Sequence, residues 1–218
     1  MNHLSSLPPG VSLTVSEASW LLDRPSAAIS QAVDRGLIVA GWGQGGEDSG
    51  TLRRLGPAKL RYLPVESELE GDLTPAARRR VYDALRGLPQ GEHGLRLGRL
   101  WVELGDVDER IAARLGRLEQ LRALVEQGPD AVPKLRGTGL PVHAVAALTR
   151  GQTVDETLED CPGLTHEQVA GAAEYARAYP KAGRPHPARS FDRLLGDLGA
   201  AMGEDWPEPE ATAPRLVP

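Results

Sequence analysis

The sequence predicts a mainly α-helical protein with a minor β component, and three observations lead to this prediction. Apolar residues recur at helical spacing in much of the chain, as in residues 13–38 and 108–127. Ser, Thr and Pro stand where helices are expected to begin. Aromatic residues make up only 4% of the chain, so Leu, Val and Ala must build the core. We divide the chain into residues 1–90, 91–130, 131–187 and 188–218.

The overall composition argues against several classes of protein. A formal net charge of -5 at pH 7 gives no global reason for nucleic-acid binding, so any such contact must come from local basic patches. The single cysteine, Cys161, cannot form a disulfide within the chain and predicts a reducing, cytoplasmic location. No segment reads as a signal peptide or a membrane span, so no membrane partner is expected.

The N-terminal region predicts a winged helix-turn-helix. Residues 13–38 contain two short helical patterns, and Thr14 with Glu17 forms a capping box at the start of the first. Two helices of this size joined by a tight break are typical of a DNA-reading helix-turn-helix. An ordinary helical hairpin has the same pattern. The outward face of the second helix is the candidate base-reading surface, and it comprises Ser26, Ala27, Ser30, Gln31 and Arg35.

The segment after this helix pair predicts the wing. Residues 51–67 suggest two short strands around Gly56-Pro57, with basic side chains suited to phosphate contacts. These candidate phosphate-binding residues are Arg53, Arg54, Lys59 and Arg61. A solvated charged face is the alternative interpretation. A helix should follow, with Thr74 as its N-cap and Pro75 at its first position.

A strand and a helix are expected in residues 91–130. Residues 100–104 are strand-like, and residues 108–127 carry an apolar helical stripe of Ile111, Leu115, Leu118, Leu121 and Val125. Such a pair cannot bury its own surface. It either packs between the two ends of the chain or pairs with a second copy, which makes a homodimer one expected state.

The last two regions predict a small helical domain and a partner-binding tail. Residues 131–187 contain a glycine turn at 137–139 and three short helices, the second and third opened by capping boxes at 153–156 and 165–168. The tail has an apolar stripe but is rich in glycine, so a lone helix there is marginal and should order against a partner. Its candidate toxin-binding residues are Phe191, Leu194, Leu195, Leu198, Met202 and Trp206. A helix packed on its own domain is the alternative.

The chain shows no catalytic or metal-binding motif. Its histidines are scattered and lack metal-ligand spacing with Cys161 or a carboxylate. They are His3, His93, His143, His166 and His186. We therefore expect no enzyme activity, no metal and no cofactor.

Two blocks of sequence point to a known family. RGTGLPV at 136–142 and RGQTVDETLEDCPGLT at 150–165 resemble the family called domain of unknown function 433, and AYPKAGRP at 178–185 is similar to its longer, VapB-like antitoxins. Gly139 stands where the family has an arginine, and Cys161 stands where it has a tyrosine.

The resemblance implies an antitoxin of a bacterial type II toxin–antitoxin pair, with an N-terminal winged helix-turn-helix. Such proteins bind their own promoter as dimers and neutralise a partner toxin, commonly a PIN-like ribonuclease. The implied partners are double-stranded operator DNA and the toxin, in a homodimer or a hetero-oligomer. A stand-alone helix-turn-helix regulator without a toxin is the alternative, and a pure interaction module that never meets DNA is a third reading.

Overall fold

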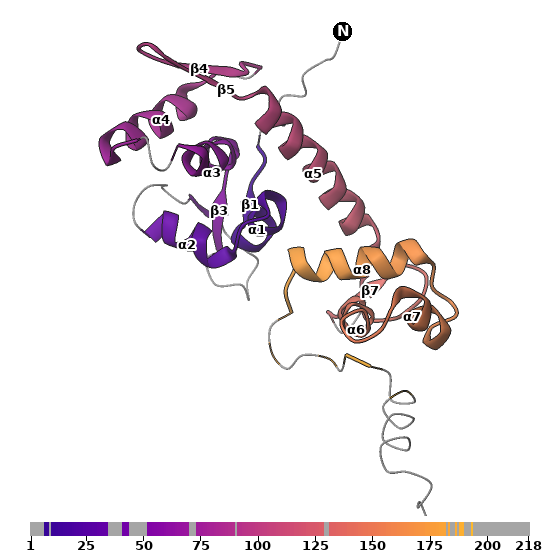
Figure 1. Ribbon diagram of the computed structural model, residues 1–218. Helices are drawn as coiled ribbons and strands as arrows, with labels where there is room; N and C mark the ends of the chain where they lie inside the picture. The colour runs from indigo at the N-terminus through magenta and orange to yellow at the C-terminus, as the bar shows by residue number, and fades with distance from the viewer. Residues whose placement is uncertain are drawn as a thin grey trace, which may run out of the picture.

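A computed structural model describes the protein at residues 7–8, 10–34, 41–43, 52–69, 73–89, 91–128, 131–181, 183, 186, 188–189 and 193. Helices dominate this part of the chain, and its strands form small antiparallel sheets (Figure 1). The predicted mainly α fold with a minor β component is confirmed.

The first five elements form a unit around a three-stranded sheet. They are β1 (Leu13–Thr14), α1 (Val15–Leu22), α2 (Ser26–Asp34), β2 (Gly41–Gly43) and β3 (Leu52–Leu55). Strand β3 lies between β1 and β2 and is antiparallel to both, with Leu13 opposite Leu55. The predicted capping box of Thr14 and Glu17 opens α1, and Asp23, at φ 51°, ends it and turns the chain into α2.

The predicted strand pair around Gly56-Pro57 is wrong. Only residues 52–55 form a strand, and Pro57 begins a helix, α3 (Pro57–Glu68). Pro57 is tolerated there because the first helical N–H needs no partner within the helix. Side chains all around α3 are buried, charged ones included. A helix buried on several sides lacks the polar face that helical periodicity needs, which explains the error.

Helix α4 (Pro75–Gly87) packs against α3, as Figure 1 shows. Thr74 caps it and Pro75 is its first residue, so this prediction is confirmed. Tyr82 of α4 meets Tyr62 of α3 edge to face, with ring centroids 5.3 Å apart. This geometry is the favourable one for aromatic pairs.

The central region contains more strand than expected. The predicted strand is β5 (Leu100–Glu103), but it pairs in a hairpin with β4 (Gly94–Leu97), which the sequence did not reveal. The long helix is α5 (Gly105–Ala123), and it ends before residue 127 because β6 (Val125–Gln127) pairs with β7 (Pro133–Leu135). Val125 is buried from β6 rather than from the helix, so the apolar stripe could not mark the helix end.

The three predicted C-terminal helices are confirmed as α6 (Val142–Leu148), α7 (Val154–Asp160) and α8 (His166–Ala178). Both predicted capping boxes are formed, by Thr153 with Glu156 before α7 and by Thr165 with Gln168 before α8. The glycine turn before α6 has positive φ at Gly137 and Gly139.

Helix α8 joins the two ends of the molecule. It packs on α1, α5, α6 and α7 (Figure 1). One hydrophobic cluster of side chains continues from Leu7 to Ala178 in the described residues. A Cβ at Gly171 would lie 2.5 Å from Leu124 Cδ2, so α8 approaches the end of α5 closely. Arg122 donates hydrogen bonds to Glu17 on α1 and to the Tyr179 hydroxyl after α8, both at 2.6 Å.

Candidate nucleic-acid interface

Helix α2 exposes the face that the sequence predicts as base-reading. Ser26, Ala27 and Gln31 are exposed and Ser30 is half-buried, while Ile29 is fully buried on the opposite side. Arg35 lies outside the described residues. The face therefore offers hydroxyl and amide groups around a small alanine, a surface able to approach and hydrogen-bond a polar partner.

The turn between α1 and α2 fixes how α2 is held. The Ser19 hydroxyl donates to the Arg24 carbonyl at 2.6 Å, and the Arg24 N–H donates to the Ser19 carbonyl at 3.0 Å. The Arg24 guanidinium donates to the Leu63 carbonyl of α3 at 2.8 Å. These bonds brace the start of α2 against two neighbouring helices.

Strands β2 and β3 form the hairpin beside α2, and β3 carries two of the candidate phosphate ligands. Arg53 Nη1 pairs with Asp34 Oδ1, at the end of α2, at 2.5 Å. Arg54 donates to the Ser12 carbonyl at 2.9 Å. The pairing of Arg53 with Asp34 could not be predicted from the sequence, because no local spacing links residues 19 positions apart.

The other two candidate phosphate ligands, Lys59 and Arg61, lie on α3 rather than on β3. Lys59 is half-buried and donates to the Arg54 carbonyl at 3.2 Å, and burial and the nearby Arg86 lower its pKa. Arg61 is 6% exposed and binds Asp108 of α5 through two bonds of 2.7 and 2.8 Å. A guanidinium closed into a buried ion pair cannot reach a phosphate, so the prediction for Arg61 is corrected: it is a structural residue.

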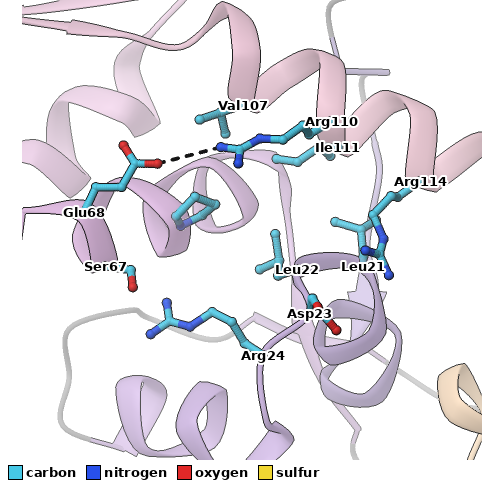
Figure 2. Close-up of a pocket in the computed structure, with 11 residues that line it drawn as sticks. Leu21, Leu22, Asp23, Arg24, Ser67, Glu68, Val107, Arg110, Ile111 and Arg114 are labelled. Carbon is cyan, nitrogen blue, oxygen red and sulfur yellow. Dashed lines mark ion pairs between the residues drawn. The ribbon is translucent and has the colours of Figure 1, made fainter.

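A small cleft lies at the junction of α1, α3 and α5, with a volume of about 330 Å3 (Figure 2). Leu21, Val107 and Ile111 line its apolar part. Most of its charged groups are already engaged: Arg110 pairs with Glu68 at 3.7 Å, and Arg114 donates to the Trp20 carbonyl at 2.7 Å while stacking over the Trp20 ring. The cleft is a crevice of mixed charge between helices.

The predicted toxin-binding residues Phe191, Leu194, Leu195, Leu198, Met202 and Trp206 all lie outside the described residues. Arg193 is described, and it pairs with the acidic end of α7, at 2.6 Å from Glu159 and 3.1 Å from Asp160. The chain at this point therefore lies against α7.

The described residues contain neither a metal cluster nor a membrane-spanning helix. That part of the chain brings together no cluster of three His, Cys, Asp or Glu side chains suited to a metal ion. None of its helices combines the length and hydrophobicity needed to cross a bilayer. Burial and the adjacent Asp160 raise the pKa of the Cys161 thiol, which favours its protonated form.

The C-terminal helices carry the likeness to known proteins. Residues 131–176 match the family model described as protein of unknown function (DUF433). The DUF433 segment, residues 131–176, thus runs from the strand β7 region into α8 and includes both capping boxes. No curated protein and no solved structure matches the chain. The resemblance expected from residues 136–142 and 150–165 is confirmed at the level of this family.

Proposed function

We propose that this protein binds duplex DNA through its N-terminal unit and acts as the antitoxin of a type II toxin–antitoxin pair, repressing its own operon. The DNA-binding half of the proposal rests on one observation: a helix pair, α1 and α2, precedes an antiparallel hairpin, and β3 joins β1 to β2. Winged helix-turn-helix domains share this arrangement, and a helix-turn-helix inserts its second helix into the major groove.

The exposed groups of α2 suit base reading. In the major groove, the Gln31 amide can donate to adenine N7 through its NH2 group and accept from the adenine N6 amino group through its oxygen. The Ser26 and Ser30 hydroxyls can bond to several bases. Arg54, on the adjacent hairpin, is the candidate phosphate ligand. Arg53 becomes available only when its ion pair with Asp34 opens.

The test of DNA binding compares Gln31→Ala with a matched control. The control is Gln127→Ala, which removes an exposed amide from β6, far along the chain. Binding of the full chain to DNA from upstream of its own gene is measured by fluorescence anisotropy, with a scrambled duplex beside it. Loss of a bidentate base contact should cost about 1–3 kcal/mol on the upstream DNA alone. Equal behaviour of both variants on both duplexes would contradict base reading by α2.

The antitoxin half of the proposal is supported by the DUF433 match and by the apolar stripe of the tail sequence. In this proposal the tail residues Phe191 to Trp206 bind a cognate toxin, a PIN-like ribonuclease, in the cytoplasm. The protein acts as a homodimer or in a hetero-oligomer with that toxin.

Growth of a bacterial host tests this half directly. The gene adjacent to this one is expressed alone, with the full chain, and with a chain truncated after Pro187. Growth arrest relieved only by the full chain is the expected result, because the truncation keeps the helix-turn-helix and removes the tail. Arrest that the full chain does not relieve would refute the antitoxin role.

A stand-alone transcription regulator is the second candidate. The ion pairs of Arg193 with Glu159 and Asp160 favour it, because they hold the start of the tail on the protein's own α7. Under this reading, the truncated chain still binds DNA, no neighbouring gene arrests growth, and the tail serves dimerisation or packing.

A further inference from the structure

A second basic surface lies on the DUF433 segment and the residues that follow it, in a groove between α6 and α8. The groove has a volume of about 470 Å3, and the residues that line it include Ala146, Ala173, Ala176 and Pro180, whose side chains are small. Its basic residues are His143, Arg150, Arg177, Lys181 and His186. Within the described part of the chain, no carboxylate lines this groove.

The positive charge of the groove is not neutralised locally. Arg150, Arg177 and Lys181 are exposed, and no described carboxylate forms an ion pair with any of them. Lys181 Nζ lies 3.0 Å from His186 Nε2. Burial, and after it the charge of Lys181, lower the pKa of both His143 and His186. A concentration of positive charge in a chain of net charge -5 attracts an anion to this one place.

The shape of the groove favours an extended polyanion. Four of its lining side chains are small, and two exposed arginines also line it, Arg150 just after α6 and Arg177 on α8. Guanidinium groups bind phosphate oxygens through paired hydrogen bonds. The sugar-phosphate backbone of a nucleic acid suits this groove. Such a backbone presents successive phosphates and carries no bulky groups that would need separate pockets.

The groove is held in a fixed position relative to the helix pair proposed to read DNA. Arg122 ties the C-terminal end of α8, through Tyr179, to Glu17 in the first turn of α1. Arg177 and Lys181 flank that tie along the chain. Figure 1 shows this end of α8 on the side of α1 and α2.

We infer that the α6–α8 groove is a second contact for the phosphate backbone of the duplex DNA that α2 reads. This inference rests on the proposed DNA binding of the N-terminal unit. The groove adds affinity that does not depend on sequence, whereas α2 supplies discrimination between bases.

Phosphate binding also predicts a pH dependence. A phosphate offsets the positive charge of Lys181, which lowers the pKa of both His143 and His186, so both pKa values rise in the complex. Groups whose pKa rises on binding take up protons, and the affinity for DNA therefore increases as the pH falls from about 8 to about 6. The increase should disappear when both histidines are changed to glutamine.

The deciding experiment compares two double variants of the full chain. Arg150→Gln/Arg177→Gln removes two charges from the groove, and Arg79→Gln/Arg80→Gln removes two from the exposed surface of α4. All four side chains are exposed, so both variants should fold. Affinity for upstream and scrambled duplexes is measured over a range of salt. The groove variant should lose affinity equally on both duplexes, and its slope of log affinity against log salt should flatten by roughly 2 relative to the control.

Each other outcome overturns the inference in a different way. If the groove variant matches the control while the wild type binds DNA, the inference fails and the proposed function stands. If the wild type binds no duplex even at low salt, both fail. If polyglutamate binds instead of DNA and the groove substitutions abolish that binding, the groove serves an acidic protein partner.

Discussion

The pair of Arg61 and Asp108 shows how a single residue can be misassigned from sequence. Arg61 is one of several arginines near the hairpin. Its side chain is buried, however, and donates two hydrogen bonds to the carboxylate of Asp108, 47 positions away. The Asp108 side chain is 1% exposed, and His93 Nδ1 lies 3.3 Å from it. The pair links α3 to α5, so it belongs to the framework that supports the helix pair of α1 and α2.

Breaking this pair should be costly. Asp108→Ala leaves the Arg61 guanidinium buried without its partner, which should lower the free energy of unfolding by about 3–5 kcal/mol. Asp155→Ala is the control, because the Asp155 side chain is 85% exposed. It should change stability by less than about 0.5 kcal/mol. Urea denaturation followed by circular dichroism measures both. Equal effects would show that the pair contributes nothing.

Gly139 lies in the turn before α6, at a position where the sequence departs from the pattern that it resembles. Its φ of +72° lies in the left-handed region, and no atom lies within 4 Å of the place where a Cβ would stand. A side chain fits there spatially, but the backbone conformation disfavours it. A side chain at residue 139 would therefore require a different backbone or carry strain.

Two glycine substitutions should have opposite signs. Gly139→Ala should destabilise the protein by about 1 kcal/mol, because the alanine must adopt a positive φ. Gly116→Ala should stabilise it by up to about 1 kcal/mol, because Gly116 is exposed within α5 and its added Cβ meets open space. Thermal unfolding of both variants reports the sign. Stabilisation by Gly139→Ala would rule out the left-handed turn.

At the scale of elements, Glu17 of α1 takes part in the contact among α1, α5 and α8, because Arg122 of α5 binds both Glu17 and Tyr179 after α8. Burial alone would raise the pKa of this carboxyl. Hydrogen bonds from the Thr14 backbone and from Arg122 outweigh burial and hold the pKa below its ordinary value. The same residue thus caps α1 and joins it to the other two helices.

Glu17 should make stability depend on pH. A carboxyl whose pKa is lower in the folded state adds stability above its unfolded pKa of about 4.3, and that stability is lost as the pH falls through the folded pKa. The difference in unfolding free energy between wild type and Glu17→Gln should be constant above about pH 5.5 and shrink below about pH 4. Glu119→Gln, an exposed change on α5, is the matched control. A difference that grows in acid would contradict the assignment.

At the scale of the whole molecule, α5 and α8 make the two ends of the chain share one core. The hydrophobic cluster includes Leu21 near the start and Val169 near the end, with Leu118 of α5 between them at 0% exposure. The helix pair of α1 and α2 and the DUF433 segment should therefore unfold together rather than as separate domains.

Two reporters at opposite ends can test this cooperativity. In a background that keeps Trp20 and replaces the other three tryptophans with phenylalanine, fluorescence reports on the N-terminal unit, because Trp20 is buried in α1. The reaction rate of Cys161, the chain's one cysteine, reports on the DUF433 segment. Leu118→Ala should lower the unfolding free energy by about 2–5 kcal/mol and shift both transitions equally in urea. Exposure of Cys161 at lower urea than the change in fluorescence would show two independent units.

The sequence by itself determined the features that arise within one or two helical turns. Thr14 with Glu17, Thr153 with Glu156 and Thr165 with Gln168 each close hydrogen bonds over three residues, and those helix starts are correct. Capping needs no remote partner, so a local pattern is enough to predict it.

Only the tertiary structure decided which charges are buried and which gather together. Surrounding elements bury most of the circumference of the helix at residues 57–68. Arg61 of this helix is buried with its partner Asp108, which α5 supplies. Arg150 and Arg177 meet in one groove because α6 packs on α8. These outcomes depend on contacts between residues far apart in the chain, and the spacing of neighbours along a sequence carries no record of them.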